Sequence, residues 1–202
     1  MLLGGMLKCA EFGYRMIIEL VDTHSDHVER ELNAALVALQ PDGIILTPPH
    51  SDNPLITQLL DERGVPFARI GSRDTSSGIS IVMDDEGAAR LATQHLIDLG
   101  HRRIGFIAGS PEYHLSQWRE DGWRDVMDTK GLPTEGLREA GDFSLESGIA
   151  AAQALLSREP RPTAILASND QMAMATTDVA TRLGLSVPRD LSVVSFDNTP
   201  IE

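Results

Sequence analysis

Two clusters of polar residues follow two apolar segments that we predict to be neighbouring strands. Ser168-Asn169-Asp170 comes at the end of segment 163–168, and Asp197-Asn198 follows segment 191–196. In an open parallel sheet, ligands bind beyond the carboxyl ends of the strands, where both clusters would lie. The first cluster could instead be only a helix cap, with Ser168 opening a capping box, and the second only a turn. Two such clusters at the same edge of the sheet favour a polar binding site.

Arg119 is a third candidate for a binding site at this edge of the sheet. It lies near the start of a helix predicted at 115–129, which follows a strand predicted at 103–108. A guanidinium group there could pair with the carboxylate of Asp197, and both groups could hydrogen-bond hydroxyl groups of a ligand.

Other reactive groups are scarce. His24 and His27 have the spacing H-x-x-H, but their surroundings are typical of the solvated first turn of a helix. No strand is followed by a glycine-rich phosphate loop, and no residue set supplies a nucleophile with its base. We therefore expect no metal site, no cofactor and no enzymatic activity.

The remaining sequence alternates between β-rich apolar segments and helical patterns. Strands are predicted at 16–20, 43–47, 65–70, 79–83, 103–108, 163–168 and 191–196, with a short one at 137–140. Such continuous apolar runs are typical of strands buried on both faces of a parallel sheet. Helices are predicted at 2–12, 115–129 and 145–157, and around the apolar faces Val28-Leu32-Leu36-Leu39, Ala88-Leu91-Ala92-Leu96-Leu99 and Met172-Ala175-Val179-Leu183. The pattern predicts an α/β fold with two domains, 1–99 and 100–202.

Composition limits the classes of function. The chain has 202 residues, one cysteine and a net charge of −13, so it lacks the basic surface of a nucleic-acid-binding domain and has no internal disulfide. No apolar run has the length of a membrane span, and the first residues lack the basic region of a signal peptide. We expect a cytoplasmic location and no membrane partner.

Segment 79–198 resembles the effector-binding core of the LacI–GalR transcriptional regulators. The matching stretches are "DDEGAARLATQHLIDLGHRRIGFIAG", "WREDGW", "GDFSLESG", "SNDQMA" and "GLSVPRDLSVVSFDN". The earlier part, from "LLGGMLKCAEFGYRMIIELVDTHSD" to "PDGIILTPP", resembles the first subdomain of that core. The resemblance implies a periplasmic-binding-protein-like fold of type I. In that fold, two Rossmann-like parallel-sheet subdomains hold a small effector, such as a sugar, in the cleft between them.

The resemblance also implies roles for five residues. Arg119 matches the family's effector-binding arginine, Asn169 the asparagine of its N-D-x-M-A motif, and Asp197 the first acid of its F-D-[DN] motif. Phe143 matches an aromatic position that often stacks on the effector, and Asp84 an acid near the cleft in the first subdomain.

The family's other segments are not recognisable in this sequence. We see no helix-turn-helix headpiece, first core strand or C-terminal return segments, and therefore expect a chain truncated at both ends. The implied function is that of a sugar-sensing core whose effector modulates operator binding through the absent headpiece. We expect a homodimer, because regulators of this type read two half-sites. The alternative is the sugar-binding protein of a transport system, which shares the fold.

Overall fold

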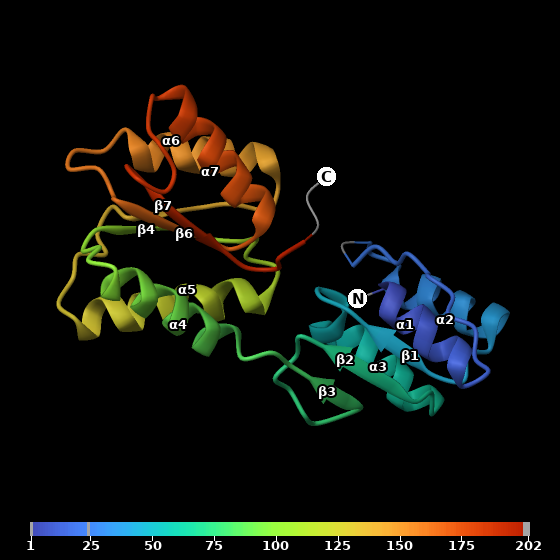
Figure 1. The fold of residues 1–202 in the computed structure, drawn as a ribbon. Helices are drawn as coiled ribbons and strands as arrows, with labels where there is room; N and C mark the ends of the chain where they lie inside the picture. The colour runs from blue at the N-terminus through green and yellow to red at the C-terminus, as the bar shows by residue number, and fades with distance from the viewer. Residues whose placement is uncertain (1, 24, 200–202) are drawn as a thin grey trace. The chain divides into compact units, whose positions relative to one another are not determined.

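The computed structural model describes residues 2–23 and 25–199, so His24 of the H-x-x-H spacing lies outside the described residues. The chain forms two compact units, Met1–Ile81 and Val82–Glu202, and each unit contains a parallel sheet flanked by helices (Figure 1). The predicted α/β class with two parallel sheets is confirmed.

Unit 1 has a three-stranded sheet of order β1-β2-β3. Its elements are α1 (Leu2–Glu11), α2 (Val28–Leu39), β1 (Ile44–Leu46), the 3₁₀ helix η1 (His50–Asp52), α3 (Pro54–Arg63), β2 (Phe67–Ile70) and β3 (Ile79–Ile81). Its core joins α2 and α3 to the sheet through side chains such as Leu32, Leu60 and Phe67. Asn53 caps α3 by accepting a hydrogen bond from the N–H of Leu55, and Pro54 is its first residue.

The predicted strand at 16–20 does not form. The backbone of this segment has no strand partner, and the side chains of Ile17, Ile18 and Leu20 are exposed. A strand exists only as part of a hydrogen-bonded ladder, so the apolar pattern alone is not sufficient.

Unit 2 has a four-stranded parallel sheet of order β5-β4-β6-β7. Its elements are α4 (Asp85–Asp98), β4 (Ile104–Ile107), α5 (His114–Thr129), β5 (Arg138–Glu139), α6 (Leu145–Leu156), β6 (Ala164–Ala167), α7 (Asp170–Arg182) and β7 (Ser192–Ser195). Figure 1 shows α4 and α5 on one face of this sheet and α6 and α7 on the other. All four residues of β4 and of β6 are buried, as expected of central strands covered on both faces.

Glycines let paired helices approach closely. A Cβ atom on Gly122 of α5 would lie 2.3 Å from the carbonyl oxygen of Glu86 in α4. A Cβ atom on Gly148 of α6 would lie 2.7 Å from the Cα atom of Met172 in α7. Both helix pairs therefore have fixed spacings over the sheet.

The division between the units differs from the predicted one at residue 99. It lies after Ile81, so α4 belongs to unit 2. The reason is packing, because α4 lies against α5 and contributes Leu96 and Ile97 to the core of unit 2. Within the described residues, no helix is long and apolar enough to cross a membrane.

Candidate functional site

The carboxyl ends of the unit 2 strands meet at one edge of the sheet, because all of them run parallel. We call this edge the rim. It comprises the loops that follow β4, β5, β6 and β7 and the first two turns of the helices after them. Four of the five predicted site residues, Arg119, Phe143, Asn169 and Asp197, lie on it.

Arg119 is buried in the rim, with only 5% of its surface exposed. Its Nε and Nη2 atoms lie 2.8 and 2.7 Å from Oδ1 of Asp85, in the first turn of α4. Its Nη1 atom donates to the carbonyl oxygen of Ser168, and its Cζ atom lies over the Phe196 ring, 4.2 Å from the ring centre. The ion pair of Arg119 is thus with Asp85, rather than with Asp197 as the sequence suggested.

Asn169 connects two parts of the rim. Its Oδ1 accepts a hydrogen bond of 3.0 Å from the N–H of Met172 and so caps α7. Its Nδ2 donates a bond of 2.8 Å to the carbonyl oxygen of Phe143. The cap of α7 is therefore Asn169, and the predicted capping box that starts at Ser168 is wrong. The hydroxyl of Ser168 donates instead to the carbonyl of Ile107.

Phe143 is held in an unusual backbone conformation, with φ at +73°. Non-glycine residues rarely adopt this region, and such strain often occurs at functional sites. Besides the bond from Asn169, the loop is fixed by Asp142, whose carboxylate accepts from the N–H of Ser144. Hydrogen bonds from Ser144 and Ser147 lower the pKa of Asp142 to about 2. The half-buried ring of Phe143 meets that of Tyr113 edge to face, at 5.5 Å between centres.

Asp197 and Asn198 follow β7, and both have positive φ values, +93° and +53°. The carboxylate of Asp197 is exposed, but the protein around it displaces enough water to raise its pKa, an effect that the positive charge of Arg119 opposes. It is an acceptor at the rim that a ligand donor could reach.

Asp84 lies at the start of α4 and thus in unit 2, not in the first subdomain as expected. Its Oδ1 accepts a bond of 2.9 Å from the N–H of Gly87 and caps the helix. The adjacent Asp85, which is not among the predicted site residues, is the buried partner of Arg119. The spacing of Asp85, Ala89, Thr93 and Ile97 along the buried face of α4 could have identified it.

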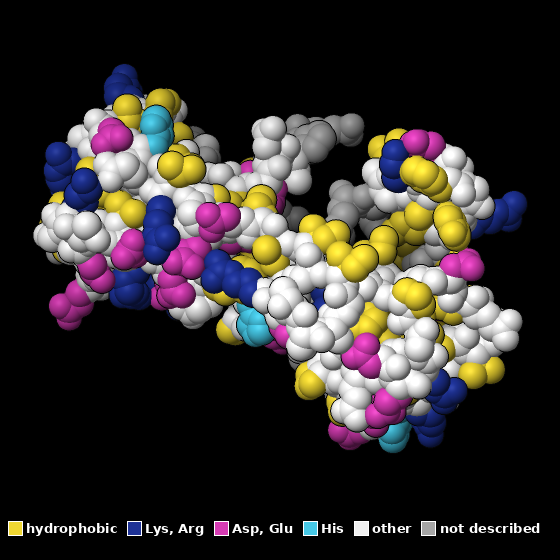
Figure 2. All heavy atoms as spheres, turned by 90° about the horizontal axis from the view of Figure 1, so that it is seen from below, with side chains coloured by type: hydrophobic (Ala, Val, Ile, Leu, Met, Phe, Trp, Pro, Cys, Tyr) yellow, Lys and Arg dark blue, Asp and Glu magenta, His cyan; other side chains and the backbone are white. Residues whose placement is uncertain are grey.

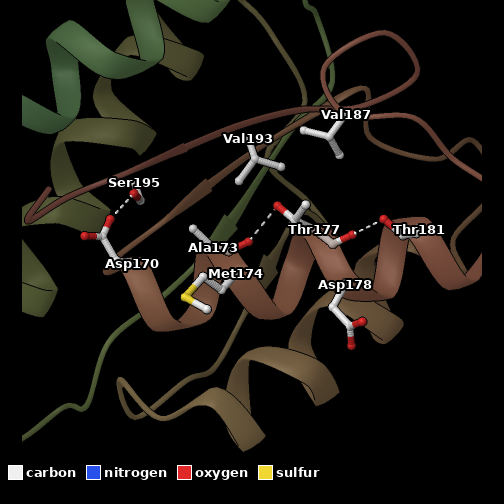
Figure 3. Close-up of a pocket in the computed structure, with 9 residues that line it drawn as sticks. All are labelled: Asp170, Ala173, Met174, Thr177, Asp178, Thr181, Val187, Val193 and Ser195. Atoms are coloured by element: carbon white, nitrogen blue, oxygen red, sulfur yellow. Dashed lines mark hydrogen bonds between the residues drawn. The ribbon is translucent and has the colours of Figure 1, made fainter. Parts of the chain in front are cut away.

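A shallow groove runs along the outer side of α7 against β7 (Figure 3). Its carboxylates already have partners. Asp170 accepts from the hydroxyl of Ser195 at 2.5 Å and from Thr199, which together lower its pKa, and Asp178 pairs with Arg182. The groove therefore has fewer polar groups left to bond a ligand than the rim. Among the described residues, no group of three or more His, Cys, Asp or Glu side chains could hold a metal ion.

Comparison with known proteins agrees with this architecture. Residues 93–202 match the family model described as "Periplasmic binding protein-like domain". The chain is 35% identical to the HTH-type transcriptional regulator CelR of Thermobifida fusca, over 98% of the chain and 59% of the relative. It is 33% identical to Catabolite control protein A of Priestia megaterium, over 93% of the chain and 57% of the relative. The chain thus spans less than two thirds of these relatives' lengths.

Solved structures show the same similarity. The structure described as a CelR–cellobiose complex matches with a TM-score of 0.85 and 33% identity, over 98% of this chain and 61% of that one. A sugar-binding LacI-family regulator from Escherichia coli, complexed with phosphate, matches with a TM-score of 0.81 and 28% identity, over 98% and 72%. These similar proteins are transcriptional regulators rather than enzymes, in agreement with the expectation from the sequence. The chain belongs to the periplasmic binding protein-like family, as the effector-binding core of the LacI-type transcriptional regulators.

Proposed function

We propose that the rim of unit 2 binds a neutral, polyhydroxylated effector, a sugar, and that this binding controls operator affinity in a regulator of the relatives' length. The observation that carries the proposal is the convergence of Asn169, Phe143 and Asp197 on one edge of a parallel sheet, where ligands of such sheets bind. The related regulator that was solved with cellobiose supports a sugar rather than another effector.

The charges of the rim favour an uncharged ligand. Asp85 already neutralises Arg119, while Asp84, Asp142 and Asp197 add negative charge around it. An anionic ligand such as a sugar phosphate would be repelled by these carboxylates. Hydroxyl groups are suited to the site, because they donate to Asp197 and accept from N–H groups.

Control of operator binding requires that the effector bind two states of the protein unequally, with a coupling of about 1–3 kcal/mol in typical cases. The alternative, a sugar-binding protein of a transport system, shares the fold. The relatives named above, all regulators, make it the less favoured reading.

In the proposed function the protein acts in the cytoplasm as a homodimer on paired half-sites. Sedimentation of a protein of the relatives' full length as a monomer at micromolar concentration would contradict the dimer.

The effector class can be tested by titration calorimetry of the chain with three kinds of probe. Cellobiose, maltose, glucose and ribose represent neutral sugars, glucose 6-phosphate an anionic sugar, and guanine a flat base. We expect binding of at least one neutral sugar and none of the phosphate. Binding of none of the four neutral sugars would overturn the proposal, and tight binding of the base or the phosphate in their place would identify another effector class.

A further inference from the structure

Ser116 has a buried hydroxyl group for which the described structure provides no hydrogen-bond partner. The residue lies in the first turn of α5, one turn before Arg119, and only 4% of its surface is exposed. Other buried hydroxyl groups of unit 2 are satisfied: Ser168 donates to Ile107, Thr93 to Ala89, and Thr176 to Met172. A buried polar group without a partner is unfavourable and uncommon, so its retention calls for an explanation.

The position of this hydroxyl suggests what it contacts. A Cβ atom added to Gly109, just after β4, would lie 2.7 Å from Oγ of Ser116 and 2.1 Å from Cζ of Phe143. The hydroxyl and the edge of the aromatic ring therefore meet against the same glycine, at the rim. The lack of a side chain at Gly109 keeps this corner open to them.

We propose that Ser116 is a specificity-determining residue of the rim, whose hydroxyl hydrogen-bonds one hydroxyl group of a sugar that stacks on Phe143. The inference rests on the proposed function and extends it. A sugar ring offers apolar C–H faces beside hydroxyl groups, which is the combination that an aromatic ring next to an unsatisfied hydroxyl accommodates. The sugar reaches Ser116 when it displaces the edge of the Phe143 ring from Gly109. The hydroxyl is unsatisfied without ligand because its partner is supplied by the ligand.

The substitution Ser116→Ala separates this role from a structural one. Removing an unsatisfied hydroxyl should leave the melting temperature of the unliganded chain unchanged or raise it. By calorimetry, the affinity for the neutral sugar that the wild type binds should fall about three- to tenfold, the loss of one hydrogen bond. The control is Ser157→Ala at the end of α6, where an exposed hydroxyl bonds the carbonyl of Ala154. It should leave the affinity unchanged.

Deoxy derivatives of the bound sugar make the test specific. For the wild type, one deoxy derivative should bind more weakly than the parent sugar, because it lacks the hydroxyl group that Ser116 contacts. For Ser116→Ala, this derivative and the parent sugar should bind equally well, because the variant has already lost the same hydrogen bond. A clear fall in melting temperature, or an unchanged affinity of Ser116→Ala for the parent sugar, would overturn this inference alone. If the wild type bound none of cellobiose, maltose, glucose and ribose, the proposed function would fail, and this inference with it.

Discussion

For Arg119, the position could be predicted from the sequence, but the ion-pair partner could not. Its position at the rim follows from the sequence, because it lies at the start of a helix after a buried strand. Its partner does not follow, because the sequence suggests Asp197, whereas the structure pairs Arg119 with Asp85. The choice between two acids depends on which helix lies beside α5, and that is tertiary information. With its guanidinium engaged by Asp85 and Ser168, Arg119 is placed to orient the rim.

The pairing predicts a large difference between two arginines that both connect α4 and α5. Arg119→Ala leaves the buried carboxylate of Asp85 unpaired and should lower the free energy of unfolding by about 3 kcal/mol. Arg90→Ala removes an exposed arginine that bonds Glu86 and Asp125, and should cost less than about 1 kcal/mol. Urea unfolding of both variants measures the difference. Equal costs would show that the Arg119–Asp85 pair is no more important than a surface pair.

At the scale of elements, the hydrophobic pattern predicted most of the helices and strands. Where the pattern failed, a neighbour decided the outcome. Segment 16–20 has the composition of a strand but no strand beside it. The predicted apolar face of α4 included Leu91 and Leu99, which are exposed, whereas the polar residues Asp85 and Thr93 are buried. Burial of these polar groups depends on their partners, Arg119 and the helix backbone, which a hydrophobicity pattern does not register.

Asn169 performs two tasks at the start of α7, and two substitutions separate them. Asn169→Ala removes the cap and the bond to Phe143, so it should cost about 1 kcal/mol of stability and weaken effector binding. Asn169→Asp keeps a capping oxygen at a favourable helix end, but it places an acceptor against the carbonyl oxygen of Phe143 in place of the donor. It should therefore retain the cap and still weaken binding.

The matched control for the cap is Asn53→Ala, which removes the corresponding amide cap of α3 and should cost about as much stability. Thermal unfolding and calorimetry of the three variants measure both effects. If Asn169→Asp bound the effector like the wild type, the link between Asn169 and Phe143 would have no role in binding.

On the scale of the whole molecule, the charge distribution does not favour DNA binding by this chain. The net charge is −13, and on the face of unit 2 formed by α4 and α5, Figure 2 shows acidic side chains interspersed among the basic ones. Phosphate contacts dominate affinity for DNA and need clustered Lys and Arg.

We therefore expect the 202-residue chain to leave duplex DNA unshifted in a gel, in both a LacI-type operator and a scrambled sequence, at 50 mM and 150 mM salt. The low-salt arm detects weak electrostatic binding, which would be similar for the two sequences. Operator-dependent retardation by this chain would contradict the assignment of its residues to effector binding alone.

The central claim, that the rim binds the effector, is tested most directly by calorimetry of Asp197→Asn with the neutral sugars. This change keeps the side-chain shape but replaces an acceptor oxygen and its charge. Protein surroundings raise the pKa of Asp197, so its charged form is disfavoured by the fold and the unliganded variant should be at least as stable as the wild type at pH 7. We predict an affinity at least about tenfold weaker for the sugar that the wild type binds. Asp178→Asn, on the outer side of α7, should bind like the wild type. An unchanged affinity in Asp197→Asn would mean that the strand-end residues are only turns and caps, and that the effector binds elsewhere.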